Sequence, residues 1–411
     1  MNKCLLHKNS LDWKVSTHYS ISEISQTDWD SLVPGTDLFM QSEYLSILEK
    51  TCLNKSITPV YSLLFKGESL CAVAYFQIID FNGSQLKAYL PATQKTKDSS
   101  FVKRKFSLTV GKVFDTLSLN VLSSGNFFTT GERCFYAIPG NENKESEWLK
   151  FVSNETLKTI QQTQKINLSL LSDFYENDLP IRDKFFQKSS FQKFLTEDEM
   201  QLKVQEDWQS FDDYLQALSS KYRVRTKKTY AMSSAIVKRR LYYNDIVKHI
   251  ETLYDLYTNV TEKAKMNLGF ISREYLMELA KNVNGRFHIY GYFLTSKIDG
   301  ADEQLVGFTS IFIHEKTMTV HYIGLNYHAN QNFNLYARML YDDIQLAIEK
   351  GVSVINFGRT AQEIKSTVGA EPRRLKSYIK ATSPILNHFM PQIVGLFKPS
   401  SWIQRQPFKT V

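Results

Sequence analysis

The order of strand-forming and helix-forming segments in the second half of the chain is the feature that most restricts its fold. Three strand-forming segments, FHIYGYFLT, QLVGFTSIFIH and TMTVHYIGL, follow one another. A helix-forming segment comes next, with apolar residues at intervals of 3, 4, 4 and 3: Phe333, Tyr336, Leu340, Ile344 and Ala347. These positions share one helix face. The apolar segment VSVINFG then predicts a strand buried between layers. A meander, a helix and a buried strand indicate an α/β (α+β) fold with a mixed, mostly antiparallel sheet flanked by helices.

The first half of the chain has the same order. The segments Ile57–Phe65 and Leu70–Ile79 are β-rich and are joined by Lys66-Gly67-Glu68, which predicts a hairpin. The amphipathic segment ESEWLKFVSNETLKTIQQTQ and the short apolar segment Ile166–Phe174 predict a helix and a buried strand. We therefore expect two similar domains, residues 1–200 and 201–382, and a C-terminal tail, residues 383–411. A single large α/β domain is the alternative for 411 residues.

The charge balance favours an anionic partner. The chain has 50 Lys and Arg against 42 Asp and Glu, a net charge of +8. This excess suits an anionic ligand, a nucleic acid or an anionic membrane surface, and it does not choose among them. The sequence contains neither a signal-peptide pattern nor an apolar run of transmembrane length, so we expect a cytoplasmic protein without a transmembrane segment. Four widely separated cysteines make a metal site improbable: Cys4, Cys52, Cys71 and Cys134.

A basic cluster in the segment LSSKYRVRTKK is the first candidate site. Five cations occupy eight positions and continue an amphipathic helical pattern: Lys221, Arg223, Arg225, Lys227 and Lys228. A solvated helix face is one interpretation, because the repulsion between like charges on a helix is small. A clamp for a phosphate or carboxylate is the other. The cluster lies at the expected junction of the two domains, so we predict that it binds substrate through Lys221, Arg223, Arg225 and Lys228.

The segment FGRTAQEIKSTVGAEPRR is the second candidate site. It follows the last buried strand directly, and ligands of open α/β sheets bind beyond the carboxyl ends of strands. Arg359 and Lys365 are expected to contact an anionic group, and Arg373 is a further substrate-binding candidate. Lys365 is also a candidate catalytic residue, and Glu363 could accept a proton from an attacking ammonium group. A charged connecting loop without a function is the alternative.

The strand TMTVHYIGL supplies the third candidate. His321 and Tyr322 are neighbours in it, so we expect their side chains to point to opposite faces of the sheet. Only one of them could then reach a cleft, where it could relay a proton as a catalytic residue. A hydrogen-bonded structural histidine is the alternative.

The run FDDYLQALSSKYRVRTKKTY and the later run VINFGRTAQEIKSTVGAEPRR together resemble the FemAB-like branch of the GNAT acyltransferase superfamily. They are most similar to the BioF2-like acetyltransferase domain of bacterial peptidoglycan biosynthesis or recognition proteins. The resemblance covers about residues 25–380. It implies tandem GNAT-like domains and an enzyme that transfers an acyl or aminoacyl group to an amine. In the peptide-bridge enzymes of this family, the donor is aminoacyl-tRNA and the acceptor is a nucleotide-linked or lipid-linked cell-wall precursor.

The sequence departs from the pattern of GNAT enzymes that bind coenzyme A. Those enzymes place a loop of the type Q/R-x-x-G-x-G/A before a helix, where backbone N–H groups meet the pyrophosphate. Here the corresponding segment is NYHANQNFN, which has no glycine. The donors considered are therefore acyl-CoA bound in an atypical way, an acyl carrier protein and aminoacyl-tRNA. A non-catalytic binding protein with the same fold is a further alternative.

The C-terminal segment SPILNHFMPQIVGLFKPSSWIQRQPF combines apolar and basic residues. Three prolines, Pro384, Pro391 and Pro399, argue against one continuous helix. We expect this tail to pack on the protein core. A peripheral membrane contact, or a lid over a lipid-linked substrate, is the alternative.

Overall fold

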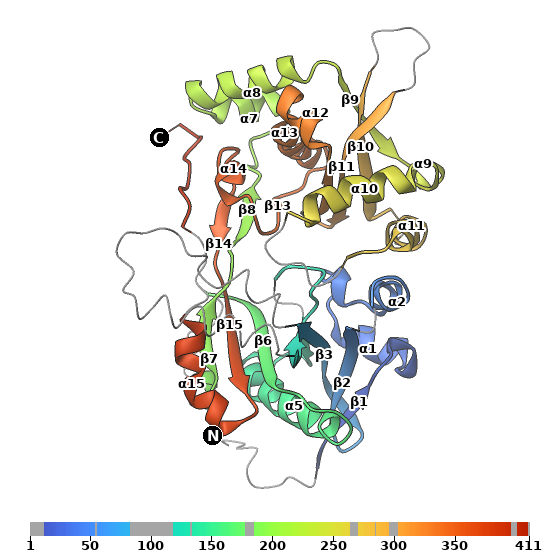
Figure 1. Cartoon of the computed structure of the whole chain (residues 1–411), viewed down its shortest axis with the longest axis vertical. Helices are drawn as coiled ribbons and strands as arrows, with labels where there is room; N and C mark the ends of the chain where they lie inside the picture. The colour runs from blue at the N-terminus through green and yellow to red at the C-terminus, as the bar shows by residue number, and fades with distance from the viewer. Residues whose placement is uncertain are drawn as a thin grey trace. The chain divides into compact units, whose positions relative to one another are not determined.

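The chain forms two compact units. A computed structural model describes residues 12–53, 56–82, 118–131, 134–176, 185–263, 270–283, 285–295, 303–395 and 401–409. Unit 1 comprises Met1–Thr196 and Leu375–Pro399, and unit 2 comprises Glu197–Arg374 and Ser400–Val411 (Figure 1). This division differs from the expected boundary at residue 382, because the strand Leu375–Ala381 pairs in the sheet of unit 1.

Unit 1 is built on a mixed sheet with the strand order β1-β2-β3-β4-β6-β15-β7, and β5 also pairs with β3. Its strands are β1 (Trp13–His18), β2 (Ile57–Lys66), β3 (Ser69–Asn82), β4 (Ser118–Ser124), β5 (Phe135–Ala137), β6 (Leu168–Tyr175), β7 (Gln192–Leu195) and β15 (Leu375–Ala381). Its α-helices are α1 (Gln26–Leu32), α2 (Ser42–Thr51), α5 (Glu145–Ile160) and α15 (Pro384–Val394). The predicted hairpin corresponds to β2 and β3, and Gly67 at its turn has a φ of 59°.

The core of unit 1 lies between its sheet and α5. Trp148 and Val152 of this helix pack against Val60, Leu64 and Phe76 of the sheet. The strands β4 and β6 run parallel and pair through three residues of each, whereas the other pairings described in this sheet are antiparallel. The sheet is therefore mixed and mostly antiparallel, as the sequence predicts.

Unit 2 repeats this plan with the strand order β14-β8-β13-β12-β11-β10-β9. Its strands are β8 (Glu199–Lys203), β9 (Ile236–Leu241), β10 (Phe287–Leu294), β11 (Gln304–His314), β12 (Thr317–Leu325), β13 (Val354–Asn356) and β14 (Glu371–Arg373). Its helices are α7 (Phe211–Ala217), α8 (Ser220–Met232), α9 (Tyr243–Lys248), α10 (Ile250–Thr261), α11 (Arg273–Asn282), α12 (Tyr327–Phe333), α13 (Leu335–Glu349) and α14 (Gln362–Ser366). The predicted meander, helix and buried strand are β10–β12, α13 and β13, which confirms the predicted fold class.

Two helical regions of unit 2 differ from the sequence-based expectation. The segment NYHANQNFN forms a separate helix, α12, before α13. The basic helical pattern is split into α7 and α8, because Leu218 is extended and forms a β-bridge with Phe408. The backbone N–H of Ser219 also donates to the carbonyl of Pro407, at 2.8 Å. A segment near the end of the chain therefore determines where the basic helix begins.

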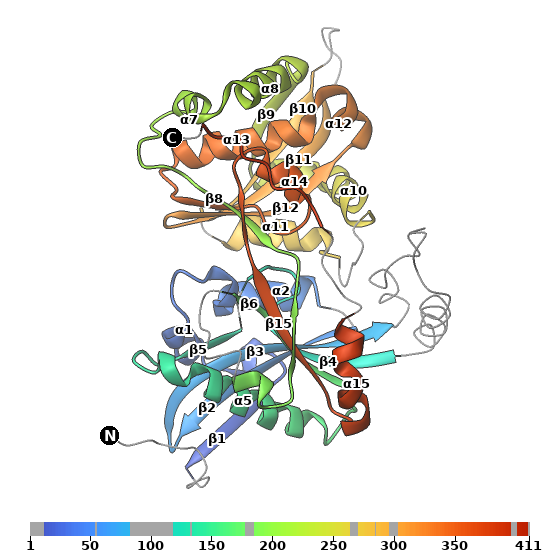
Figure 2. The ribbon, with the colours of Figure 1, turned by 90° about the vertical axis from the view of Figure 1, so that its left-hand side faces the viewer.

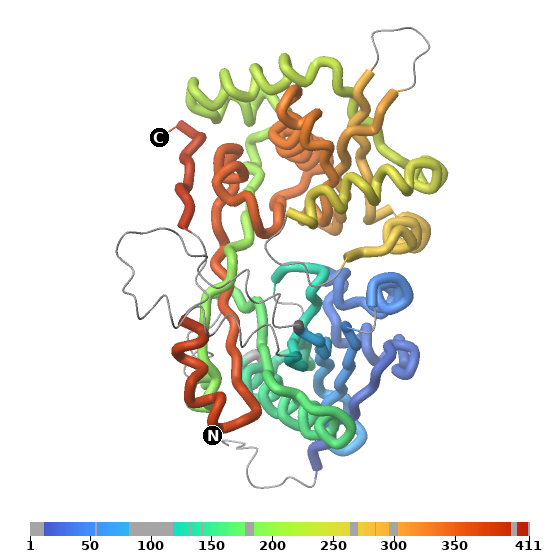
Figure 3. The backbone as a smooth tube through the Cα atoms, in the orientation of Figure 1, coloured from blue at the N-terminus to red at the C-terminus, as the bar shows by residue number. Residues whose placement is uncertain are grey.

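The C-terminal tail contributes to both units. Residues Pro384–Val394 form α15, which contacts β15 and β7 and runs through Pro391. The described residues 401–409 then lie in unit 2, where their trace runs beside α14 (Figure 3). Within the described ranges, no helix is both long enough and apolar enough to cross a bilayer.

Candidate functional site

The loop that follows β13 has an unusual backbone. Gly358, Thr360 and Ala361 have φ angles of 67°, 64° and 48°, so three residues of four are left-handed and two of these are not glycine. Such residues cost energy and persist where the surroundings hold them, often at functional sites. Here the side chain of Asn356 accepts a hydrogen bond from the N–H of Gly358, at 2.8 Å. The loop is therefore held in one conformation from its first residue.

Lys365 fixes the rest of this loop. Its side chain is buried, and its Nζ donates to the carbonyls of Phe357, Gly358 and Arg359 at 2.7, 3.3 and 2.5 Å. An ammonium group has three donors, so these carbonyls use all of them. Burial lowers the pKa of Lys365 to about 7, against the opposing effect of Glu197 and Glu199. The geometry favours a positioning role over the predicted contact with substrate.

Glu363, the predicted base, is held by the C-terminal segment. Its Oε1 accepts from both Nε and Nη2 of Arg405, and the Nε distance is 3.0 Å. The Arg405 N–H donates to Ser366 Oγ at 3.0 Å, which fixes the segment against α14. This ion pair raises the pKa of Arg405, to which Tyr222 of α8 also contributes. The C-terminal segment therefore connects α14 with the start of the basic helix.

The other two residues predicted in this region are placed differently. Arg359 lies in the left-handed loop and is half-buried. Arg373 is exposed at the end of β14, which pairs with β8 at the edge of the sheet. Arg359 is thus one of the residues whose backbone Lys365 holds, whereas Arg373 lies on the outermost strand.

The basic helix α8 turns most of its cations to solvent. Tyr222, Thr226 and Thr229 form its buried face. Four cations are exposed and Arg223 is half-buried; the exposed ones are Lys221, Arg225, Lys227 and Lys228. α8 lies along α13 (Figure 2). The cations are therefore presented on the outer side of a helix that is fixed on its inner side.

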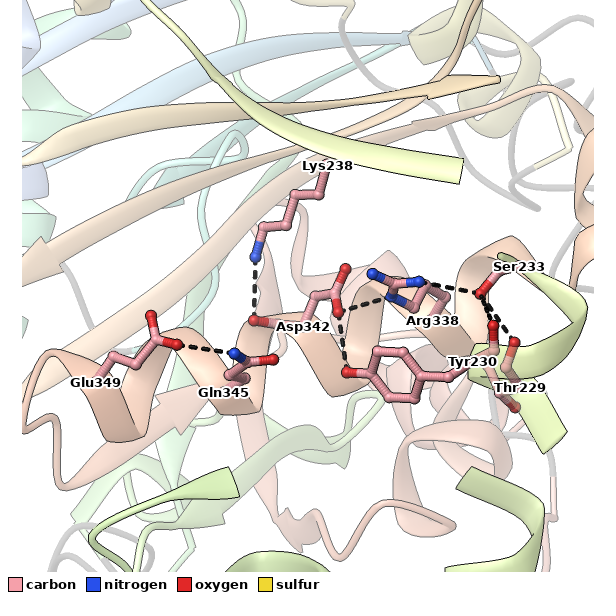
Figure 4. A network of polar contacts seen from close by, with 8 residues as sticks. All are labelled: Thr229, Tyr230, Ser233, Lys238, Arg338, Asp342, Gln345 and Glu349. Carbon is pink, nitrogen blue, oxygen red and sulfur yellow. Dashed lines mark hydrogen bonds and ion pairs between the residues drawn. The ribbon is translucent and has the colours of Figure 1, made fainter. Parts of the chain in front are cut away.

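A buried polar network attaches the C-terminal half of α8 to α13 (Figure 4). Asp342 Oδ1 accepts from Arg338 Nε at 2.8 Å and from the hydroxyl of Tyr230 at 3.0 Å. Arg338 Nη1 also donates to Ser233 Oγ, at 3.2 Å. The Nζ of Lys238 on β9 donates to the backbone carbonyl of Asp342, at 3.1 Å. Asp342 therefore joins the basic helix, α13 and the sheet.

The adjacent carboxyl group, Asp343, is also buried in α13. Burial raises the pKa of Asp343 to about 8, and the neighbouring Asp342 contributes in the same direction. Lys238 opposes this rise. A carboxyl group in this environment keeps its proton near neutral pH.

The third candidate pair, His321 and Tyr322, is arranged by a β-bulge. Thr309 pairs with Ile323 and Ile311 pairs with Val320, so Ser310 lies opposite both residues. The Ser310 hydroxyl accepts from the N–H of Tyr322 and donates to its carbonyl, at 2.9 and 3.0 Å. The rings of His321 and Tyr322 are 4.2 Å apart. The expectation that they point to opposite faces is therefore wrong.

Both rings pack against helices α10 and α11. His321 Nε2 is 2.8 Å from the hydroxyl of Tyr275 on α11, and the Tyr322 ring contacts Tyr257 of α10 edge-on. The flanking residues Val320 and Ile323 pack instead in the clusters that include α13. His321 and Tyr322 thus lie on the opposite face of the sheet from α13 and α8, and they are not brought together with the basic helix.

The N-terminus of α13 is capped by the protein itself. Asn330 of α12 accepts the N–H of Tyr336 through its Oδ1, at 2.8 Å. Asn334, between the two helices, has a left-handed backbone with a φ of 52°. One of the N–H groups that could meet a pyrophosphate at this helix end is therefore already occupied. Across the described part of the chain, no group of three or more His, Cys, Asp and Glu residues could hold a metal ion.

A family model described as peptidoglycan biosynthesis/recognition matches residues 129–396. The chain belongs to the FemAB-like family. The FemAB-like chain is similar in fold to the crystal structure of FemX, with 10% identity, a TM-score of 0.53 and coverage of 92% of this chain and 99% of that one. A tandem GNAT protein from the clavulanic acid biosynthesis pathway shares 8% identity, with a TM-score of 0.52 and coverage of 91% and 99%. No match to an individually curated protein was found.

These comparisons agree with the two units described above. Each unit has a GNAT-like fold. As a member of the FemAB-like family, the protein is a transferase of the acyl- or aminoacyl-transferase class, and the family is described as one of peptidoglycan biosynthesis or recognition. Sequence reasoning did not find Arg405, Tyr275, Asp343 or the Asp342 network. A signal was present for Asp343, because it follows Tyr336 by seven residues and so shares the apolar face of this helix.

Proposed function

We propose that unit 2 transfers an acyl or aminoacyl group to the amine of an anionic cell-envelope precursor. The observation that carries this proposal is the charge of α8. It has five Lys and Arg and no Asp or Glu, a formal charge of +5, whereas the net charge of the whole chain is +8. This one helix carries more than half of the net charge, which makes it a contact for a negatively charged reactant.

In this proposal, six arginines and lysines contact the reactant and a further lysine shapes the site. Lys221, Arg223, Arg225 and Lys228 of α8 contact phosphate or carboxylate groups, as does Arg359, and Arg373 serves a more distant part of the substrate. Lys365 acts through the backbone of the Arg359 loop and is a positioning residue.

The transfer itself is a direct attack. The amine nitrogen bonds to the carbonyl carbon of the donor, the carbonyl oxygen becomes an oxyanion, and the leaving group departs when the carbonyl re-forms. The ammonium group must first lose a proton. Glu363 is a candidate for accepting it when its pair with Arg405 opens. His321 lies on the opposite face of the sheet from α8, so it is a candidate only for an amine that approaches from the side of α11, where its ring is hydrogen-bonded to Tyr275.

Aminoacyl-tRNA is the favoured donor. The capped N-terminus of α13 and the glycine-free helix α12 argue against coenzyme A bound in the usual GNAT manner. An acyl carrier protein is the second candidate, because an acidic carrier would also match the charge of α8.

Transfer assays with three donors test this proposal: aminoacyl-tRNA, acyl carrier protein and acyl-CoA. Each is combined with a nucleotide-linked and a lipid-linked precursor. We expect product from aminoacyl-tRNA, and we expect ribonuclease treatment to abolish it. A double change of Arg225 and Lys228 to Ala should raise KM for one reactant at least about tenfold. Lys227→Ala, an exposed cation of the same helix, is the matched control. Binding of a precursor without turnover from any donor would favour a non-catalytic protein.

A further inference from the structure

The outer edge of unit 2, formed by β9 and α9, combines exposed apolar and basic side chains. β9 is the last strand of its sheet and pairs with β10. Five large apolar residues are exposed within sixteen positions, and Tyr242 is the most exposed of them at 63%: Met232, Val237, Tyr242, Tyr243 and Val247. Three exposed cations lie among them: Arg239, Arg240 and Lys248. We call this set the β9–α9 edge, after the two elements labelled in Figure 1.

A cavity of about 480 Å³ opens at the same edge. Its lining residues include all three cations of the edge, together with Phe293, Asp245 and Glu303. Glu303 pairs with Arg239, and Asp245 accepts the N–H of Tyr242 at 3.0 Å. Within the described ranges, Arg240 and Lys248 form no salt bridge, and the Arg240 guanidinium lies 4.9 Å from the centre of the Tyr242 ring, so both charges remain available to an external anion.

The charges argue against self-association through this edge. If two copies paired antiparallel at the centres of their β9 strands, Lys238, Arg239 and Arg240 of one copy would lie opposite the same residues of the other. Like charges directly opposite in a sheet are destabilising. The partner that complements this edge is therefore anionic.

The apolar side chains distinguish between two anionic partners. Single-stranded nucleic acids stack their bases on aromatic rings, and three of the five exposed apolar side chains of the edge, Met232, Val237 and Val247, are aliphatic and offer no such surface. Aliphatic side chains, interfacial tyrosines and surrounding cations are the combination that binds at the headgroup and acyl boundary of a bilayer.

We propose that the β9–α9 edge docks on the surface of an anionic phospholipid bilayer. Arg240 and Lys248 contact lipid phosphates, while Tyr242 and Val247 enter the interface. This inference goes beyond the proposed transfer, because it concerns a different set of residues and needs no substrate.

Vesicle sedimentation of the full-length protein tests the proposal. We expect binding to vesicles of equal parts phosphatidylglycerol and phosphatidylcholine, and little binding to phosphatidylcholine alone. The double change Arg240→Glu and Lys248→Glu should weaken binding at least about tenfold, because each cation near an anionic surface adds attraction. Lys50→Glu with Lys165→Glu is the matched control, since both lysines are exposed in unit 1. It should change binding by less than about twofold.

The apolar contribution is measured separately. Tyr242→Ser with Val247→Ser should retain binding at low salt and lose it at about 0.5 M salt, where charge attraction is screened and the parent protein still binds through apolar contact. Thermal melts identify variants that do not fold, and Lys248→Glu alone then replaces the double change.

Three results would overturn the proposal. The first is equal binding to neutral and anionic vesicles, or none to either. The second is an equal loss in the Lys50 and Lys165 control. The third is binding to single-stranded RNA that the Arg240 and Lys248 variant loses, with vesicle binding unaffected. Transfer to a soluble acceptor should be unchanged in this variant, so failure of docking and failure of the proposed transfer are distinguishable.

Discussion

The Nζ of Lys365 lies 2.5 Å from the carbonyl oxygen of Arg359, inside a turn of which Lys365 forms the buried centre. We expect Lys365→Met to lower the free energy of unfolding by about 2–4 kcal/mol, because it leaves three carbonyls without their charged donor. Transfer activity should fall with it. Chemical denaturation measures the loss, and Lys350→Met, an exposed lysine, is the control. Unchanged stability in Lys365→Met would contradict the positioning role.

Arg359→Ala should give the opposite pattern. Its side chain is half-buried and its backbone is held by Lys365, so the loop should keep its conformation after truncation. We expect transfer to fall at least about tenfold, equivalent to about 1.4 kcal/mol, with a loss of stability below about 1 kcal/mol. Steady-state kinetics and a thermal melt of the same sample separate the two effects. Parent-like activity would remove Arg359 from the site.

The buried pair of Asp342 and Arg338 predicts a large effect of substitution on stability. Asp342→Ala leaves the Arg338 guanidinium buried without its carboxylate, so we expect the free energy of unfolding to fall by about 3–5 kcal/mol. Tyr230 of α8 loses its fixed partner, so affinity for the anionic reactant should fall as well. Gln345→Ala, which removes an exposed contact with Glu349 on the same helix, should stay within about 0.5 kcal/mol. Equal losses in the two variants would argue against the network.

Asp343 predicts a pH dependence of stability. Its folded-state pKa, about 8, exceeds the ordinary value of 3.8, so between these values the folded protein binds a proton that the unfolded chain has lost. The free energy of unfolding should therefore fall as the pH rises from 5 to 8, by up to about 1.4 kcal/mol per pH unit. Asp343→Asn should remove this slope, whereas Asp212→Asn, at an exposed position of α7, should keep it. Denaturant titrations at several pH values decide, and parallel slopes for Asp343→Asn and the parent would refute the prediction.

His321 and Tyr275 predict a kinetic effect. If this pair relays the proton of the attacking ammonium, His321→Gln should lower kcat at least about tenfold with KM little changed. Tyr275→Phe should shift the pH profile of kcat, because the ring loses its hydrogen-bond partner. His328→Gln, at an exposed position of α12, is the control. An unchanged pH profile in Tyr275→Phe would assign the pair a structural role.

Local patterns predicted much of the fold. Three features depend on residues close together in the sequence, and each lies where the pattern predicts: the Lys66-Gly67-Glu68 turn, the meander β10–β12 and the apolar face of α13. The site depends on contacts that are distant in the chain. Leu218 ends α7 because Phe408, 190 residues later, pairs with it. The spacing of apolar and charged residues within the segment 208–234 does not indicate this contact.

The site residues show the same limit. An alternating strand predicts that His321 and Tyr322 diverge, and one additional residue opposite Ser310 brings them together. The charge of Lys365 suggested a contact with substrate, but its burial depends on the left-handed turn that folds its own loop carbonyls around it. Residue type and order identified these positions as unusual. Only the backbone geometry distinguishes an exposed side chain that can bind a ligand from a buried side chain that holds a loop in place.

The origin of β15 has a consequence for biosynthesis. This strand pairs with both β6 and β7 of unit 1, although it is encoded after the whole sheet of unit 2. A nascent chain that has emerged only as far as Arg374 can already form every strand of the second sheet, while the first still has an open gap between β6 and β7. The first sheet is therefore completed after the second, and a chain that stops before Leu375 would leave the first sheet unfinished.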